Sequence, residues 1–255
     1  MIRVAVVGKG GSGKSVFSGT LARVLGRAGE RVLALDSDTM PGLAFNLGVQ
    51  TPSEPALLAA AERGENGRWR FKPGIGPVRA VQRFAMDAPD NVRLLEFGTP
   101  GPEGQAEIAP AIQAFFRVVH GIGDARALRE WSIVGDLPAG PRQIAFDWAP
   151  YAQTYLIVAE PTMQSLLTAR RVARLATSRP GPTVSLVASK VKNDADLRRI
   201  EEFMGVRATA VMPRDPAVIE AERLGVALID HAPESDAVRA VEGLVERLSA
   251  AAGRA

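Results

Sequence analysis

Gly8-Lys9-Gly10-Gly11-Ser12-Gly13-Lys14-Ser15 is the most informative stretch of this 255-residue sequence, and it directly follows the apolar run of residues 2–7. It matches the pattern G-x-x-x-x-G-K-[ST], in which glycines let the backbone turn its N–H groups inward around a phosphate. The helix expected to begin near Gly13 adds the positive end of its dipole. A glycine-rich turn that matched by chance would not need strand, loop and helix in this order. The sequence therefore predicts a phosphate-binding loop.

Two lysines lie in this loop. Lys14 supplies a cation for the β- and γ-phosphates of a nucleotide, and the Ser15 hydroxyl suits Mg²⁺. Lys9 is a second cation, which ordinary loops of this kind do not need. The predicted nucleotide contacts of this region are Gly8, Lys9, Gly10, Gly11, Ser12, Gly13, Lys14, Ser15 and Val16.

Composition agrees with a globular nucleotide-binding protein. Hydrophobic residues make up 46% of the sequence, and no apolar run approaches the roughly 18 residues that cross a bilayer. The sequence contains no cysteine, which excludes disulfides, thiolate zinc sites and cysteine-ligated iron–sulfur clusters. The first residues form a core strand rather than a signal peptide, so we expect a cytoplasmic protein without a transmembrane segment.

Apolar strands alternate with helical segments along the chain. This pattern predicts an α/β fold: one doubly wound, mostly parallel sheet with helices on both faces. We expect a single domain over residues 1–255, with an irregular insertion at about 64–91 that has room for a hairpin. The expected strands are 4–7, 31–35, 92–97, 132–135, 155–159, 184–188 and 209–212, and the expected helices are 14–28, 56–63, 107–120, 162–177, 194–204, 215–224 and 235–250.

Acidic residues follow two of these strands. Asp36 and Asp38 come at the carboxyl end of the second strand, where ligands of open α/β sheets lie. An extended chain would send both carboxylates to one face, toward the phosphate loop. One of them suits Mg²⁺, held through water, or orientation of the attacking water. The alternative is a surface turn or a helix cap.

Asp136 follows the buried strand 132–135 and fits the metal-side carboxylate of a nucleotide hydrolase. Gly140, a few residues later, is placed to offer a backbone N–H to the γ-phosphate. A strand followed by Asp is weak evidence alone. It is stronger here because the phosphate loop and the pair Asp36 and Asp38 precede it in the chain.

The motif Lys9-Gly-Gly-Ser-Gly-Lys14-Ser15 resembles the deviant, signature-lysine form of the phosphate loop in ATPases of the MinD/ParA group. The resemblance covers almost the whole chain. Asp36-Ser-Asp38 and Asp136-Leu-Pro-Ala-Gly140 match the two switch segments of the group. The run from Tyr155 to Thr162 matches the strand and turn that follow, and the run from Met212 to Ala221 matches the late loop around adenine. The late loop and residues 94–104 are most similar to the CooC-type maturation factors of carbon monoxide dehydrogenase.

This resemblance implies a mechanism. Two subunits sandwich ATP and Mg²⁺ face to face as a homodimer. Lys9 reaches the partner's γ-phosphate, while Lys14 serves its own nucleotide. Asp38 positions the hydrolytic water, and Ser15 ligates Mg²⁺ with help from Asp136. The remaining nucleotide contacts that the resemblance implies are Gly140, Ser189, Lys190, Pro213, Arg214 and Asp215.

Two departures limit this analogy. CooC-type proteins carry a Cys-x-Cys pair ahead of the second switch, whereas residues 98–104 here contain no cysteine. Ser189 stands where the group has an asparagine that recognises adenine, so the backbone of Pro213 and Arg214 is expected to contribute to base selection, with ATP favoured over GTP. His120 and His231 are expected to be structural or surface residues rather than metal ligands.

Three functions remain open. The first is a partner-stimulated ATPase that assists maturation or assembly of a client enzyme, and the second is a MinD/ParA-like positioning ATPase on a membrane or DNA. Arg170, Arg171 and Arg174 favour DNA, although a solvated helix face explains them as well. The apolar helix 235–250 is more typical of packing on the domain than of membrane binding. The third is a nucleotide-gated binding module that hydrolyses little or no ATP.

Overall fold

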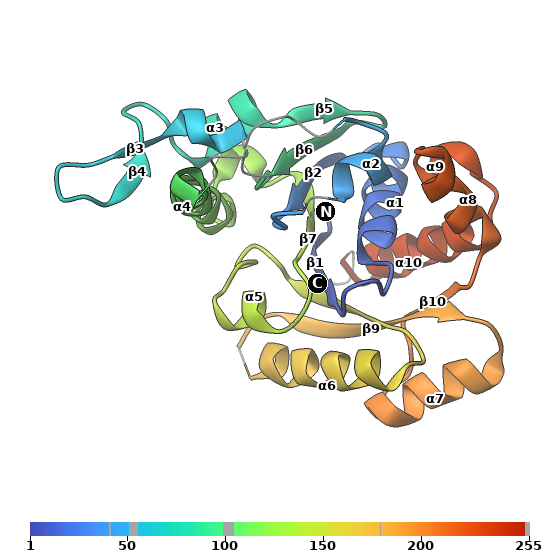
Figure 1. The fold of residues 1–255 in the computed structure, drawn as a ribbon. Helices are drawn as coiled ribbons and strands as arrows, with labels where there is room; N and C mark the ends of the chain where they lie inside the picture. The colour runs from blue at the N-terminus through green and yellow to red at the C-terminus, as the bar shows by residue number, and fades with distance from the viewer. Residues whose placement is uncertain (41, 51–55, 99–104, 179, 253–255) are drawn as a thin grey trace.

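The fold is known from a computed structural model that describes residues 1–40, 42–50, 56–98, 105–178 and 180–252 (Figure 1). An eight-stranded sheet forms its centre, with the strand order β10-β9-β8-β1-β7-β2-β6-β5. Every pairing is parallel except that of β5 with β6. The strands are β1 (Arg3–Gly8), β2 (Arg31–Asp36), β5 (Met86–Ala88), β6 (Val92–Glu96), β7 (Trp131–Asp136), β8 (Thr154–Ala159), β9 (Thr183–Val191) and β10 (Ala210–Pro213).

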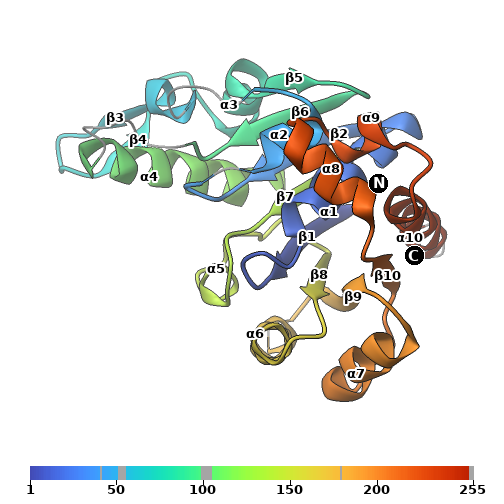
Figure 2. The same cartoon turned by 45° about the vertical axis from the view of Figure 1, so that its right-hand side comes forward.

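Helices cover both faces of this sheet (Figures 1 and 2). Strand residues alternate between the two cores, so Val4 and Val6 pack on one side and Ala5 and Val7 on the other. The helices are α1 (Lys14–Arg27), α2 (Leu43–Leu47), α3 (Pro77–Phe84), α4 (Gln105–Ile122), α5 (Arg142–Ala145), α6 (Met163–Thr177), α7 (Asp194–Met204), α8 (Pro216–Leu224), α9 (Leu228–His231) and α10 (Asp236–Ala252).

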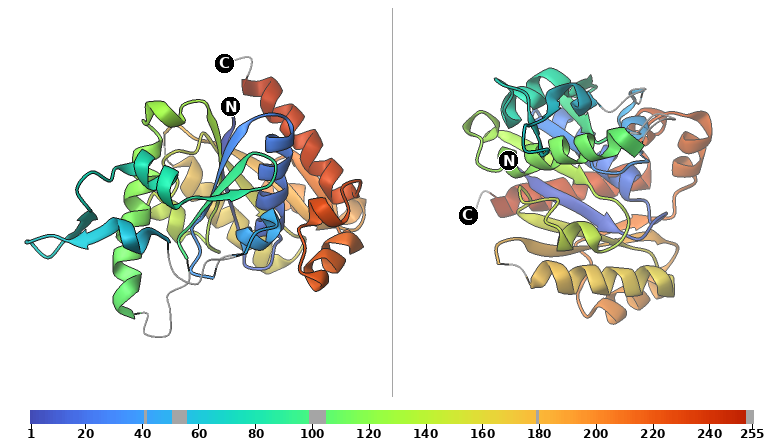
Figure 3. Two further views of the ribbon diagram at one scale, coloured as in Figure 1. Left: turned by 90° about the horizontal axis from the view of Figure 1, so that it is seen from above. Right: turned by 60° about the vertical axis from the view of Figure 1, so that its left-hand side comes forward.

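The first core lies under α1, α2, α9 and α10. The last helix, α10, runs beside α1, as the view from above shows (Figure 3). Its apolar side chains belong to this core. Val238, Val241 and Leu244 are fully buried there. The expectation that this helix packs on the body of the protein is confirmed.

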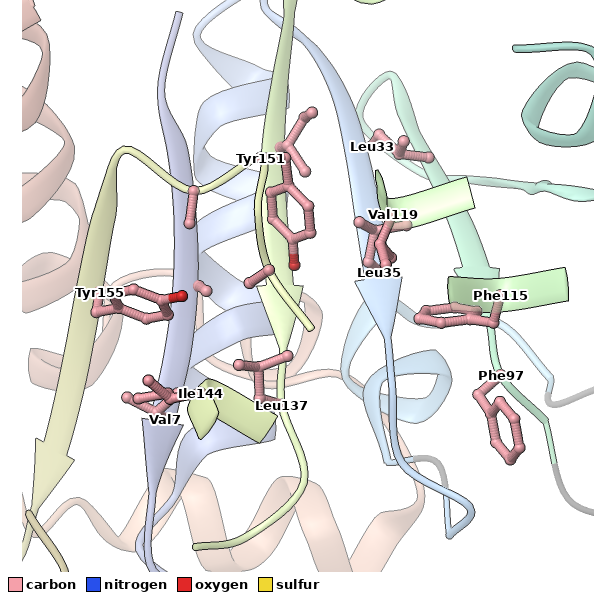
Figure 4. Packing of buried hydrophobic residues seen from close by; sticks show 14 of the residues in the cluster. Val7, Leu33, Leu35, Phe97, Phe115, Val119, Leu137, Ile144, Tyr151 and Tyr155 are labelled. Carbon is pink, nitrogen blue, oxygen red and sulfur yellow. The ribbon is translucent and has the colours of Figure 1, made fainter. Parts of the chain in front are cut away.

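The second core lies under α4, α5 and α6 on the opposite face. Phe115 of α4 meets Phe97 edge-on with ring centres 6.1 Å apart. Figure 4 shows these rings at one end of the cluster and Tyr155 at the other, with Tyr151 between them. This core ties the ends of β6 and β7 to α4, and those strand ends carry the acidic residues of the site.

The prediction of a doubly wound, mostly parallel sheet is confirmed, and its seven strands are all present near their expected bounds. Two local expectations were wrong. Residues 56–63 are not one helix but a 3₁₀ turn (Ala56–Ala60) followed by the strand β3 (Ala61–Arg63). The region 64–91 is not irregular, because it holds β4 (Trp69–Phe71), α3 and β5. Strand β5 extends the sheet in an antiparallel sense.

The hairpin of β3 and β4 projects away from the body (Figure 1). It contacts α4, which also packs against α3. Among the described residues, no helix combines the length and the hydropathy that a membrane span needs.

Candidate functional site

The phosphate loop joins β1 to α1 and is held in shape by its own backbone. Gly11 and Gly13 have φ values of 77° and 93°, which only glycine adopts without strain. At Gly8, a Cβ would lie 2.5 Å from the carbonyl oxygen of Val158, so no larger residue fits there. Gly13 caps α1 without any side-chain hydrogen bond, which leaves the first N–H groups of the helix for an anion.

The two lysines of the loop differ in their placement. Lys14 is 9% exposed, and its ammonium lies 3.4 Å from the carbonyl oxygen of Lys9, inside the curve of the loop. The Lys9 side chain is 32% exposed and donates to the carbonyl of Gly10 at 3.1 Å. One ammonium therefore faces inward and the other lies on the outer side of the same loop.

A carboxylate from the neighbouring strand stands beside the outer lysine. Glu160, just after β8, lies 3.7 Å from the Lys9 ammonium and 3.4 Å from that of Lys190. Lys190 also donates to the carbonyl of Gly11. Glu160, which follows β8, and Lys190, in β9, thus both lie on the outer side of the phosphate loop. Glu160 was not among the predicted site residues, although it follows a buried strand as Asp136 does.

Ser15 and Asp136 lie together at the start of α1. The hydroxyls of Ser15 and Ser18 both hydrogen-bond to the Asp136 carboxylate, at 3.3 Å for Ser18. Gly42, which precedes α2, lies against the same serine, because a Cβ there would be 3.4 Å from the Ser15 hydroxyl oxygen. The predicted magnesium residues Ser15 and Asp136 are therefore neighbours.

Three acidic side chains stand in a row at the carboxyl ends of adjacent strands. Asp36 of β2 is in register with Glu96 of β6 and with Asp136 of β7, so the three point to the same side of the sheet. Burial, followed by the charge of Asp36, raises the pKa of Glu96 to about 7. Burial likewise raises the pKa of Asp136 and of Asp36. A nearby cation would stabilise the charged forms of these three buried carboxylates.

Asp36 organises the segment that follows β2. Its carboxylate accepts backbone N–H groups from Asp38 at 3.0 Å, Gly42 at 3.1 Å and Leu43 at 2.9 Å. This is the turn and helix-cap role that the sequence left as the alternative. Asp38 lies beyond the end of β2, half-buried, and accepts the N–H of Met40 at 3.1 Å. The expectation that both carboxylates leave one face of an extended strand was wrong, because the chain turns after Asp36.

Gly140 lies close to the phosphate loop, as the sequence predicts. Its φ of 95° needs glycine, and its N–H donates to the carbonyl of Gly8 at 3.1 Å. The same N–H would have to leave Gly8 before it could reach a γ-phosphate. Its role as a γ-phosphate contact stays a prediction.

A cavity of about 380 Å³ adjoins the end of the loop. Its size suits a nucleoside, and ligand sites of this kind are concave with a few polar groups among apolar ones. Seven of the predicted nucleotide contacts line it, together with Glu160, Thr162, Lys192 and Val218. These seven are Gly13, Val16, Ser189, Lys190, Pro213, Arg214 and Asp215.

Several of these polar groups are already engaged. The Ser189 hydroxyl donates to the carbonyl of Ser12 at 2.8 Å, and the Arg214 N–H donates to Val191 at 2.9 Å. The two carboxylate oxygens of Asp215 accept the N–H groups of Ala217 and Ala237 at 2.9 and 3.1 Å. Asp215 thus holds the starts of α8 and α10. It shapes the cavity wall through these bonds.

The arginine cluster is less continuous than its spacing suggested. Arg170 stacks on the Phe203 ring at 3.7 Å and donates to the carbonyl of the same residue. Arg171 and Arg174 remain exposed. The three side chains therefore do not form one solvated patch on α6.

The two histidines lie in different surroundings. His120 packs on Phe116, with ring centres 4.0 Å apart, and lies 2.9 Å from the Asp147 carbonyl. His231 is exposed on α9. Within the described ranges, no group of three or more His, Asp or Glu side chains has the geometry of a metal site. Of the cysteine-free segment 98–104, residues 99–104 lie outside the described residues.

Comparison with known families and proteins gives one family. A family model described as the CobQ/CobB/MinD/ParA nucleotide binding domain matches residues 4–229. An uncharacterized ATP-binding protein of Methanocaldococcus jannaschii is 29% identical over 237 residues, covering 88% of this chain and 90% of that protein. The carbon monoxide dehydrogenase accessory protein CooC of Rhodospirillum rubrum is 27% identical over 248 residues, covering 91% of each.

Solved structures agree with these sequence matches. The cell division ATPase MinD of Pyrococcus furiosus superposes with a TM-score of 0.74 at 25% identity, covering 98% of this chain and 99% of that one. MinD of Pyrococcus horikoshii, solved with Mg-ADP, has a TM-score of 0.75 at 23% identity, with 99% and 98% covered. Because the identity to the Pyrococcus horikoshii protein is only 23%, this second match shows similarity of fold alone.

Proposed function

The chain belongs to the CobQ/CobB/MinD/ParA nucleotide-binding family, and from this premise we propose that it is an ATP-dependent dimerising switch that hydrolyses ATP to ADP and phosphate. It acts as one nucleotide-binding domain in the cytoplasm and assists the maturation or assembly of a client enzyme. Hydrolysis is slow until the client engages.

The contrast between the two loop lysines carries this proposal. Lys14 is buried inside its own loop, where it serves the subunit's own nucleotide. Lys9 lies on the outer side of the loop with its side chain 32% exposed, where it can reach a second subunit once it leaves Glu160. An ammonium that meets the γ-phosphate only across a dimer would stabilise charge in the way an arginine finger does.

Exposed apolar side chains support a docking face beside this loop. Phe146, just after α5, is 66% exposed, and Met163 and Leu167 are exposed on α6. The helices α5 and α6 contact each other, and α6 begins just after Glu160, which reaches Lys9. Exposed apolar residues on neighbouring elements favour an interaction surface.

The donor set at the start of α1 fits Mg²⁺. A serine hydroxyl and a carboxylate are hard oxygen ligands, and Mg²⁺ takes few of these while substrate phosphates and water complete its shell. Ser15 would hold the ion with Asp136 beside it, and Asp38 would act on the attacking water. The ion would supply charge neutralisation at the phosphate oxygens.

The client hypothesis and the positioning hypothesis differ in partner rather than in chemistry. Similarity to CooC over almost the full chain supports a client enzyme. The absence of cysteine means that a metal would not be passed through a Cys-x-Cys pair. Similarity to MinD supports the positioning alternative.

Asp38→Ala tests this proposal. With Mg²⁺ and ATP, the variant should accumulate as a dimer and lose at least about 100-fold in turnover, since a residue that orients the attacking water acts mainly in the chemical step. Affinity capture with the trapped dimer should retain the client, whereas DNA affinity that falls steeply with salt would favour positioning. If Asp38→Ala changes neither turnover nor dimerisation, the protein is a nucleotide-gated binding module instead.

A further inference from the structure

Glu160 contacts both cations on the outside of the phosphate loop. Its side chain is 12% exposed, and its two oxygens face different partners: one lies 3.7 Å from Lys9 and the other 3.4 Å from Lys190. The Thr162 hydroxyl donates to the first oxygen at 3.2 Å. The carboxylate is therefore fixed at the end of β8 while the two lysine side chains bend toward it.

This contact occupies Lys9 within its own subunit. In the dimer proposed above, the same ammonium must leave Glu160 to reach the γ-phosphate of the partner. Release is feasible because Lys9 is one-third exposed and its other contact, to the carbonyl of Gly10, is within the loop. A partly exposed ion pair changes an equilibrium by only about threefold, so it can delay the departure of Lys9 without preventing it.

We propose that Glu160 is a positioning residue that holds Lys9 on its own phosphate loop and so opposes dimerisation until ATP is bound. The inference rests on the proposed function and concerns how it is regulated. Binding of a triphosphate at the partner subunit offers Lys9 a stronger anion than a single shared carboxylate. Glu160 then keeps Lys190, which remains beside Gly11.

Glu160→Gln removes the charge while keeping the shape and an oxygen that can accept from Thr162. Each symmetric dimer releases two Lys9 contacts, each worth about threefold, so the dimerisation constant with a non-hydrolysable ATP analogue should rise by about tenfold. Affinity for ADP, which lacks the γ-phosphate, should stay within about threefold. Glu62→Gln is the matched control, since Glu62 pairs with Arg70 on the distant hairpin at 3.0 Å.

A second measurement needs no dimer. The chain has five lysines, so ¹³C-methylated lysine side chains give a small set of NMR signals in the nucleotide-free protein. Glu160→Gln should shift the signals of Lys9 and Lys190 and leave that of Lys72 unchanged. Glu62→Gln should shift neither of the first two.

The two readouts separate the possible failures. An unshifted Lys9 signal, or a dimerisation constant that is unchanged or lower in Glu160→Gln, overturns the inference. A loss of ADP affinity greater than about threefold also overturns it, because Glu160 would then be a nucleotide contact. If the Lys9 signal shifts but no variant dimerises with the analogue, the contact stands and the dimer proposal fails.

Discussion

Glu96 should make the nucleotide-free protein less stable as the pH rises. Its side chain is 2% exposed, neither carboxylate oxygen has a hydrogen-bond partner in the described part of the chain, and Asp36 lies on the adjacent strand in register. Burial and this neighbouring charge raise its pKa from an ordinary 4.5 to about 7. The folded state therefore keeps a proton on Glu96 over a range in which the unfolded chain has lost it.

The linkage between proton binding and folding gives the sign and the size of this change in the free energy of unfolding. Where the folded state binds more protons than the unfolded state, the free energy of unfolding falls as the pH rises. For pKa values of 4.5 unfolded and about 7 folded, the loss of unfolding free energy between pH 5 and pH 8 is about 2–3 kcal/mol. Glu96→Gln cannot ionise, so the variant should gain this amount relative to the wild type between the two pH values.

Urea unfolding of the nucleotide- and magnesium-free proteins at both pH values measures this difference. Comparing two pH values cancels the cost of burying an unpaired amide, since that cost does not depend on pH. Glu242→Gln, an exposed residue of α10, is the control and should give the same stability difference from wild type at both values. A Glu96→Gln difference that changes by less than about 0.5 kcal/mol between pH 5 and pH 8 would refute the reasoning.

Three further substitutions test the packing around the site. Arg23→Ala should lower the free energy of unfolding by about 2–4 kcal/mol, because this buried guanidinium donates to a backbone carbonyl and two carboxylates, while Arg239→Ala on the surface should cost under about 1 kcal/mol. Gly135→Ala should lower the free energy of unfolding by about 2 kcal/mol or more in the same assay, since a Cβ would lie 1.8 Å from the Tyr151 hydroxyl oxygen. Adding Tyr151→Phe should restore part of that free energy, because it removes this oxygen. Ser189→Ala should weaken ATP binding about fivefold in calorimetry by removing the bond to the phosphate loop, and an unchanged affinity would mean that this bond does not shape the loop.

The sheet was predictable because its signal is local. Each buried strand is a short apolar run bounded by turn residues, and each intervening helix has an apolar face of its own. The strand β5 was missed because Met86–Ala88 is only three residues long. It also pairs with β6 through contacts that no local sequence pattern indicates. The same holds for α2 and α5, which are shorter than two helical turns.

Only those parts of the site that carry a sequence motif were predictable. The phosphate loop and the acid at the end of β7 follow from residue type and spacing. The use of Asp36 depends instead on tertiary structure that brings the N–H groups of Gly42 and Leu43 to its carboxylate. Glu160 could be placed after a strand but not beside Lys9, because β8 and the loop meet through the pairing of β1 with β8. Tertiary juxtaposition, rather than sequence pattern, determines these contacts.

Sedimentation of the wild type, Lys9→Ala and Lys14→Ala with Mg²⁺ and a non-hydrolysable ATP analogue is the most direct test of the central claim. The wild type should form a dimer, and Lys14→Ala should lose analogue binding altogether. Lys9→Ala should bind the analogue within about threefold of the wild type and remain a monomer. If Lys9→Ala forms the dimer as readily as the wild type, or if both variants lose binding equally, Lys9 does not act across a subunit interface.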